Sequence, residues 1–365
     1  MKKKKLVVFG LERNPFNDNL FAALQASYFD VNVNYILHGR ALKNNTSWAK
    51  FEKAHYFARN VTKFATLDVV LTVLKSPQSV FIFTGYAKVS FIMGMMVCVI
   101  LRKKYLVFSD VLPFKIKKPF FLKVLKSVAH WLAFHKSFGV LTTGKPGRDA
   151  LIELGCHPTK IVNYPYTPRV KNPNGLSAKA LNKIKVSDVV PSILVSGQLI
   201  QRKGVDLMIY ALSKLKARNV DVECFIEGDG PALDFIKDLS VRLDVQDRVF
   251  FTGFNEPDLH SALLTSVDIV VSPSRWDPWG NIIPEAMSAG KVVIASSAVE
   301  SGRDRIVHGV NGLIFTVDNP MELVNCLCAV IVDKDFSTKL ADAACGSADI
   351  WTADFNAISL ASFLN

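Results

Sequence analysis

Residues 192–208 read SILVSGQLIQRKGVDLM: a short apolar run, a turn that extends from Gly197 to Gly204, and the start of a helix pattern. A nearly continuous apolar run is typical of a parallel strand that helices cover on both faces. The turn also holds two adjacent cations, Arg202 and Lys203. Cations beside glycines at a strand-to-helix turn suit a phosphate, because the helix amino terminus adds its dipole. The stretch predicts a strand–turn–helix unit with a candidate phosphate site; an ordinary surface turn is the alternative.

The same alternation of short apolar runs and helix-length intervals extends in both directions from this stretch. In the second half of the chain, the expected strands are Ser192–Gly197, Val222–Gly228, Arg248–Gly253, Asp268–Pro273, Val292–Ser296 and Leu313–Thr316. In the first half, they are Leu6–Gly10, Val31–Leu37, Ser79–Thr84, Lys104–Asp110 and Phe138–Thr143. Strands that alternate with helices form parallel sheets. The sequence therefore predicts an α/β fold with two doubly wound parallel sheets.

The length of the chain indicates two domains. Its 365 residues, of which 50% are hydrophobic, exceed the size of roughly 250–300 residues at which one core stops growing. Pro and Asn cluster between residues 165 and 190, which favours a linker there. We predict a first domain over residues 1–180 and a second over residues 181–349. Open parallel sheets bind ligands outside the carboxyl ends of their strands, so we expect the chemistry in a cleft between the two domains.

Charge is distributed unevenly along the chain. Residues 1–190 contain 30 Lys and Arg against 9 Asp and Glu, whereas residues 191–365 contain 14 against 23. Such a difference favours an anionic surface or substrate as the partner of the first half. A solvated basic face is the alternative.

The cysteines and the apolar segments indicate the compartment. The six cysteines are scattered without a CxxC pair, which favours a reducing environment. The apolar run near the amino terminus ends at Gly10, which is too early for a secretion signal. The longest uncharged apolar stretch, Val89–Leu101, has 13 residues, short of the ~20 that a membrane-spanning helix needs. We expect a cytoplasmic protein whose membrane contact, if it has one, is peripheral.

A second stretch that could bind a ligand is residues 273–290, PSRWDPWGNIIPEAMSAG. A strand ends before it, a loop holds Asp277 and Gly280, and a helix begins near Ile282, so the first helical amides point back at the loop. Glu285 lies in the first turn of that helix, and the two carboxylates can flank one polar ligand such as a sugar. The alternative is structural: Glu285 complements the helix dipole and Asp277 caps a turn.

Five blocks of sequence, taken in order, resemble the carboxyl-terminal domain of the retaining GT-B glycosyltransferases, the GT4-type "glycosyl transferases group 1" family. The blocks are residues 197–204, 226–231, 247–253, 273–290 and 309–315. The first domain resembles the family only in outline. The resemblance implies the GT-B fold, with two Rossmann-like domains facing across a cleft, and implies that the segment 350–365 crosses back onto the first domain.

The resemblance also implies roles for individual residues. Lys203 and Arg202 are expected to contact the donor diphosphate, and Asp277, which replaces the first Glu of the family's paired acidic motif, is expected to meet the transferred sugar. Asp110 is a further catalytic candidate, although Ser109 stands where many members have His. The donor-binding residues implied are Gly197, Gly228, Phe254, Gly280, Asn281, Ile282 and Glu285, with Glu285 on the ribose and the loop of Phe254 near the nucleobase.

The implied reaction uses a UDP- or GDP-sugar as donor substrate and needs no side-chain nucleophile, no metal site and no cofactor. A two-lobed protein that binds a sugar or nucleotide without turnover is the alternative from another class. A dinucleotide-dependent oxidoreductase is not supported, because no GxGxxG follows a predicted strand.

Basic and aromatic side chains alternate between residues 102 and 136, which suits a helix in the headgroup region of an anionic bilayer. The residues expected to meet the membrane or the acceptor are Lys115, Lys117, Lys118, Phe120, Phe121 and Lys123. From this we expect a peripheral protein on the cytoplasmic membrane face with a lipid-linked saccharide acceptor, as in surface polysaccharide or lipopolysaccharide synthesis. A solvated basic helix and a soluble acceptor remain alternatives. Nucleic-acid binding is not expected, because no recognisable module is present.

Overall fold

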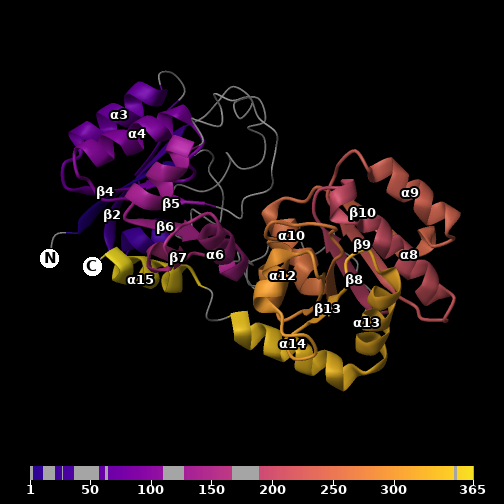
Figure 1. The fold of residues 1–365 in the computed structure, drawn as a ribbon. Helices are drawn as coiled ribbons and strands as arrows, with labels where there is room; N and C mark the ends of the chain where they lie inside the picture. The colour runs from indigo at the N-terminus through magenta and orange to yellow at the C-terminus, as the bar shows by residue number, and fades with distance from the viewer. Residues whose placement is uncertain are drawn as a thin grey trace. The chain divides into compact units, whose positions relative to one another are not determined.

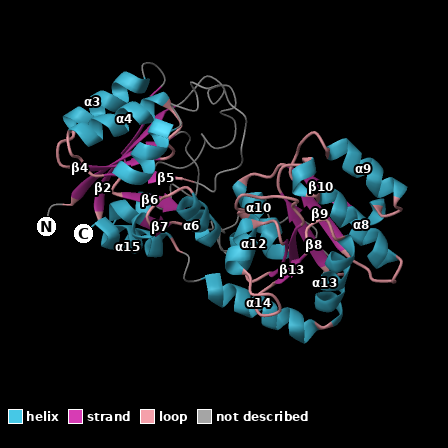
Figure 2. Cartoon of the chain, viewed as in Figure 1, coloured by secondary structure: helices cyan, strands magenta, loops and turns pink. Residues whose placement is uncertain are grey.

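The computed structural model of the chain describes residues 3–10, 21–26, 28–36, 57–61, 65–109, 127–166, 189–348 and 352–364. These residues belong to two compact units (Figure 1). The first unit is Met1–Thr167 together with Trp351–Asn365, and the second is Pro168–Ile350. Each unit consists of a parallel sheet and its covering helices (Figure 2).

The second unit has a six-stranded sheet with the order β10-β9-β8-β11-β12-β13, and all of its neighbouring strands are parallel. The strands are β8 (Ser192–Ser196), β9 (Glu223–Glu227), β10 (Val249–Gly253), β11 (Ile269–Ser272), β12 (Val292–Ser296) and β13 (Leu313–Phe315). Each of the six strands predicted for this half of the sequence is confirmed.

Helices cover both faces of this sheet. Ile193 and Val195 of β8 point into one apolar core, and Leu194 between them points into the other. Successive side chains of a strand alternate between its faces, so a strand that is apolar at every position needs two cores. The helices are α8 (Val205–Lys216), α9 (Leu233–Arg242), α10 (Pro257–Ser266), α11 (Ile282–Ser288), α12 (Glu300–Arg305), α13 (Pro320–Val332) and α14 (Lys334–Ala348).

The strand order defines one position in the second unit where a ligand is expected. From β8 the chain adds β9 and then β10 on one side, and returns to add β11 on the other side of β8. Loops that leave β8 and β11 therefore diverge, which is the switch point where doubly wound sheets bind ligands. The two loops are residues 197–204 and 273–281, which belong to the two stretches, 192–208 and 273–290, where the sequence predicts ligand binding.

The first unit has a seven-stranded sheet with the order β3-β2-β1-β4-β5-β6-β7. The strands are β1 (Lys4–Gly10), β2 (Phe29–Ile36), β3 (Phe57–Val61), β4 (Ser79–Phe83), β5 (Tyr105–Phe108), β6 (Gly139–Thr142) and β7 (Ile161–Asn163). The five inner strands match the sequence prediction, but the two edge strands, β3 and β7, were not predicted.

Three helical segments lie in a row in the first unit: α3 (Ala65–Lys75), α4 (Val89–Ile100) and the π-helix η1 (Trp131–Lys136). α4 packs against both of the others. Their inward side chains, such as Val69 and Phe91, join a core with strand residues of the sheet. A further helix, α6 (Gly144–Glu153), follows β6.

The helix α15 (Ala353–Leu364) packs on the first unit, beside β7 (Figure 1). Leu360 is fully buried in a core that also contains Leu6 of β1. The Asn356 side-chain amide donates to the carbonyl of Pro165 at 2.8 Å. Residues far apart in the sequence therefore complete one core.

Candidate functional site

The two loops at the switch point of the second unit are in direct backbone contact. Gly204 has φ of 65°, and a Cβ at this position would lie 2.1 Å from the carbonyl oxygen of Pro273. The amide of Arg275 donates to the carbonyl of Arg202 at 2.8 Å. The φ value lies in the left-handed region that favours glycine. The contact also requires glycine, because a side chain at this position would clash with the neighbouring loop. The glycine thus fixes the distance between the two loops.

Lys203 and Asp277 meet across these loops. The ammonium of Lys203 lies 2.5 Å from Oδ2 of Asp277, and the guanidinium Nη1 of Arg202 lies 3.9 Å from Oδ1. Asp277 is only 5% exposed, and its Oδ1 also accepts from the amide of Trp279 at 3.3 Å. Arg202 is held in turn, since its Nη1 donates to the Trp276 carbonyl at 2.8 Å. The two predicted cations and the predicted carboxylate therefore form one cluster.

Two further glycines allow the carboxyl ends of β8 and β9 to approach each other. A Cβ on Gly228 would lie 1.9 Å from the carbonyl oxygen of Gly197. A Cβ on Gly197 would lie 3.5 Å from the ammonium of Lys203, so the lysine side chain extends along this glycine. The resemblance implied that Lys203 contacts the diphosphate and that both glycines bind the donor, and the structure places these three residues together.

The start of α11 presents backbone amides. Within residues 189–348, no protein acceptor takes the amides of Gly280, Asn281 or Ile282. The Gly280 carbonyl accepts from the hydroxyl of Ser301 at 2.8 Å, which holds the loop in place. Gly280 has φ of 84°, and a Cβ there would lie 2.7 Å from a methyl group of Val299. This loop therefore offers donors to a polar ligand beside Asp277.

Glu285 belongs to a second charged cluster, which was not predicted from the sequence. Its Oε2 lies 3.4 Å from Nε2 of His260, and Nδ1 of the same ring lies 2.6 Å from Oε2 of Glu227. The other oxygen of Glu227 accepts from the side-chain amide of Asn255 at 2.9 Å. His260 lies on α10, Glu227 ends β9 and Glu285 lies on α11, so three elements converge on one imidazole.

This arrangement keeps His260 protonated. Burial opposes the charge, but the hydrogen bonds to Glu227 and Glu285 raise the pKa of His260 from 6.5 to about 10. Burial raises the pKa of Glu227, but the hydrogen bonds that its carboxylate accepts and the charge of His260 together outweigh burial, so the pKa is lowered. At neutral pH both ring nitrogens therefore donate, and the imidazolium fixes the orientation of Glu285. No described donor binds Oε1, the second oxygen of Glu285.

The remaining predicted site residues lie elsewhere. Phe254 follows β10, two strands away from β8, and is 58% exposed. Asp110 and the residues 115–123 of the expected membrane or acceptor site lie outside the described residues, as does most of the expected linker at 165–190. Of the missed cluster, Glu227 stands in the block 226–231 that carried the resemblance, whereas His260 and Asn255 have no signal in the sequence.

The described residues also bear on metal binding and on membrane spans. In that part of the chain, no group of three or more His, Cys, Asp or Glu side chains is placed to hold a metal ion. The described helices include none with the length and apolar character to cross a membrane.

The sequence profile of the family "Glycosyl transferases group 1" matches residues 179–345. The second unit is a glycosyl transferases group 1 domain. An uncharacterized glycosyltransferase of Methanocaldococcus jannaschii is 35% identical over 153 residues, 42% of this chain and 39% of that protein. A lipopolysaccharide core biosynthesis glycosyltransferase of Rhizobium meliloti is 27% identical over 152 residues, 42% of this chain and 43% of that protein. The chain thus spans less than half the length of each of these relatives.

Similarity to solved structures extends over the whole chain. HepE of Anabaena, solved in complex with UDP, superposes with a TM-score of 0.76 at 20% identity and covers 99% of both chains. The prediction of an α/β fold with two Rossmann-like parallel sheets, the fold of the GT-B glycosyltransferases, is confirmed.

Proposed function

We propose that this protein is a retaining glycosyltransferase that moves a sugar from a UDP- or GDP-sugar to a lipid-linked saccharide in surface polysaccharide or lipopolysaccharide synthesis. One observation carries the proposal. At the switch point of a glycosyl transferases group 1 domain, Lys203 and Arg202 lie against Asp277 beside a glycine-lined backbone. Cations and close backbone approach suit a diphosphate, and a buried carboxylate suits sugar hydroxyls.

The donor diphosphate binds at Lys203 and Arg202 in this proposal. An ammonium has three N–H donors and a guanidinium has five, and Asp277 takes only one donor of Lys203. The remaining donors can reach phosphate oxygens from the carboxyl end of β8. The absence of a side chain at Gly197 keeps this approach open.

The sugar and the ribose bind at the two carboxylates. Asp277 and the amides of Gly280, Asn281 and Ile282 meet the transferred sugar. Glu285 accepts the ribose hydroxyls with Oε1, while His260 holds Oε2. His260 is thus a positioning residue, since it acts on the ligand only through Glu285.

Catalysis in this proposal is electrostatic. Breaking the bond between the anomeric carbon and the nucleoside diphosphate leaves negative charge on the phosphate, and fixed cations and amides stabilise that charge in the transition state. The acceptor hydroxyl attacks from the same face of the sugar, and the departing phosphate takes its proton. This route needs neither a side-chain nucleophile nor a metal ion.

The proposed acceptor is lipid-linked, and the protein is proposed to work on the cytoplasmic face of the membrane. Two observations support this assignment. The first half of the chain has 30 Lys and Arg against 9 Asp and Glu, and a relative in Rhizobium meliloti is named for lipopolysaccharide core biosynthesis. An excess of cations attracts a protein to an anionic leaflet.

The proposal is tested by calorimetry with UDP, GDP and a panel of their sugars. One base series binds wild type with micromolar Kd, and Lys203→Ala weakens that binding at least tenfold (~1.4 kcal/mol). The matched control is Lys214→Ala, which removes an exposed lysine of α8 in the same unit and leaves Kd unchanged. Absence of nucleotide binding by wild type would refute the donor site. Binding without transfer to any saccharide acceptor would favour the non-catalytic alternative.

A further inference from the structure

The outer face of α4 is apolar. All four exposed residues of this helix are hydrophobic, Val89, Met93, Met96 and Ile100, with exposed fractions between 39% and 74%. They recur at intervals of four, three and four residues, which places them in one stripe along the helix. An ordinary surface helix shows its polar side chains to water and its apolar stripe to the core. α4 has an apolar core-facing side as well, so both of its sides are hydrophobic.

The neighbouring helix α3 extends this surface. Leu67, Leu71 and Leu74 are exposed on it at intervals of four and three residues, with exposed fractions between 39% and 56%. α3 packs along α4, as Figure 1 also shows. On the other side of α4, η1 adds Trp131, which is 47% exposed. We name the surface formed by these side chains of α3, α4 and η1 the α3–α4 face. Exposed apolar side chains gathered on neighbouring, packed helices are typical of an interaction site.

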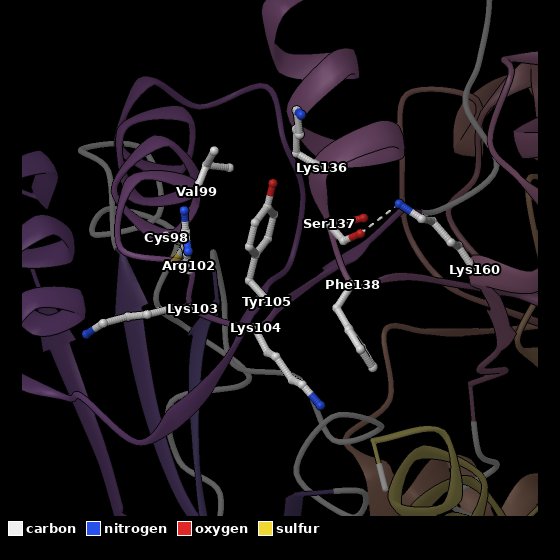
Figure 3. A pocket seen from close by; sticks show the side chains of 10 residues that line it. All are labelled: Cys98, Val99, Arg102, Lys103, Lys104, Tyr105, Lys136, Ser137, Phe138 and Lys160. Atoms are coloured by element: carbon white, nitrogen blue, oxygen red, sulfur yellow. Dashed lines mark hydrogen bonds between the residues drawn. The ribbon is translucent and has the colours of Figure 1, made fainter.

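A cationic cavity of about 490 Å³ adjoins the carboxyl-terminal end of this face (Figure 3). Its lining includes no acidic side chain but five basic ones, Arg102, Lys103, Lys104, Lys136 and Lys160. It lies where β5 and β6 begin, the end of the first sheet opposite to the carboxyl ends of the strands.

Backbone carbonyls hold two of the cavity's lysines. Lys103 donates to the carbonyls of Val73 and Ser76. Lys160 donates to the carbonyl of His135 and to that of Ser137, the second of which Figure 3 shows as a dashed line.

Lys104 and Lys136 make a different kind of contact. The Lys104 ammonium lies 4.4 Å from the ring centroid of Phe138, and that of Lys136 lies 4.9 Å from that of Trp131. Neither contact neutralises the positive charge, so the lining of the cavity stays cationic.

We infer that the α3–α4 face lies on an anionic phospholipid bilayer, with its apolar side chains at the acyl boundary and the cavity's cations on lipid phosphates. Charge complementarity decides for the bilayer over a second copy of the chain. The apolar side chains of this face lie next to a group of cations that an anionic partner would complement, whereas a second copy that docked through the same face would present the same cations. An apolar stripe with a basic margin and an exposed tryptophan is the pattern of an interfacial helix. The inference rests on the proposed lipid-linked acceptor and names the surface that brings the enzyme to it.

Flotation of the full chain with vesicles tests the inference without any nucleotide or acceptor. One set of vesicles is phosphatidylcholine, and the other contains about one third phosphatidylglycerol. Wild type floats with the anionic set and at least tenfold less with phosphatidylcholine alone. Met93→Glu/Met96→Glu floats at least tenfold less than wild type on anionic vesicles. Its matched control is Val241→Glu/Met321→Glu, which adds the same charge at exposed apolar helix positions of the second unit and floats like wild type.

A second pair of variants tests the cavity. Arg102→Gln/Lys136→Gln reduces partition onto anionic vesicles roughly thirty-fold, since each cation contributes ~1 kcal/mol near such a surface. The matched control, Lys214→Gln/Lys339→Gln, removes two exposed lysines of the second unit and has little effect.

Three results would overturn the inference. Wild type could fail to float with anionic vesicles, or Met93→Glu/Met96→Glu could float like wild type. The third is that wild type forms a dimer and that Met93→Glu/Met96→Glu dissociates it. Nucleotide binding is measured separately and on the other unit. Failure of flotation therefore leaves the donor site standing, and failure of nucleotide binding leaves the docking face standing.

Discussion

The ammonium of Lys203 and the carboxylate of Asp277 are 2.5 Å apart although 74 positions separate the two residues in the chain. Two loops that follow different strands create the pair, and a parallel sheet brings the carboxyl ends of those strands together. The carboxylate is almost fully buried and the lysine is partly buried, so the pair is shielded from solvent screening more than a surface ion pair.

A double-mutant cycle measures this coupling. We expect Lys203→Ala, Asp277→Asn and the double variant to give a coupling free energy of about 1–3 kcal/mol by urea denaturation. Asp277→Asn alone destabilises the protein, because it leaves a partly buried ammonium without its partner. A coupling energy within error of zero would show that the two loops are held by their backbone contacts alone.

The His260 cluster predicts a dependence of stability on pH. The pKa of His260 is raised from 6.5 to about 10 in the folded protein, so its stabilising contribution is fully present below pH 6.5 and is lost as pH rises through 10. The difference in unfolding free energy between wild type and His260→Gln should therefore shrink steadily between these two pH values. A difference that stays constant over this range would mean that His260 is not held protonated.

The same cluster predicts a loss of stability at neutral pH. His260→Ala leaves the carboxylates of Glu227 and Glu285 without their shared cation, and removing one partner of a buried charge network costs about 3–5 kcal/mol. Denaturant titration at pH 7 measures this loss. Introducing Glu227→Gln into the His260→Ala background should recover part of it, because one of the unpaired charges is then removed.

Gly204 is expected to tolerate no side chain. Gly204→Ala places a methyl group on the Pro273 carbonyl and also occupies a left-handed conformation, which together cost about 2–5 kcal/mol. Gly309→Ala is the matched control, since Gly309 has φ of 77° but no neighbour within 4 Å of the added carbon. Its cost is the conformational strain alone, about 1–2 kcal/mol. Equal melting temperatures for the two variants would contradict the contact between the loops.

The packing of α15 predicts where a distant substitution acts. Leu360→Ala removes a fully buried side chain from the core of the first unit and should cost about 2–5 kcal/mol. Ile358→Ala, on the exposed side of the same helix, should have little effect. Hydrogen exchange locates the change. We expect faster exchange in strands of the first sheet and unchanged exchange in the second unit.

The second sheet could be predicted strand by strand for a physical reason. Helices cover all of it, so strands such as β12, which reads VVIAS, are apolar at consecutive positions and stand out from the helices. The missed strands are edges. β7 has only three residues, and β3 reads FARNV, in which two polar residues break the apolar run. Edge strands need less apolar surface, and the sequence signal weakens accordingly.

The residues of the candidate site likewise fall into those that the sequence indicates and those that it does not. Lys203 and Asp277 stand in sequence contexts that themselves indicate a ligand: a cationic glycine turn, and a loop before a helix. His260 does not, because a single histidine in the first turn of a helix predicts nothing about its partners. Its role arises only when the ends of β9, α10 and α11 converge, and that convergence is a property of the folded topology.

The position of α15 has a consequence for synthesis on the ribosome. The second unit is continuous in sequence, whereas the first unit combines residues from before and after it. When translation has produced the strands of the first sheet, the helix that will cover Leu6 has not yet been made. Those apolar side chains remain without their cover until the second unit has also been translated. Nascent chains are therefore expected to acquire protease resistance in the second unit first, and to depend on chaperones for the first unit during that interval.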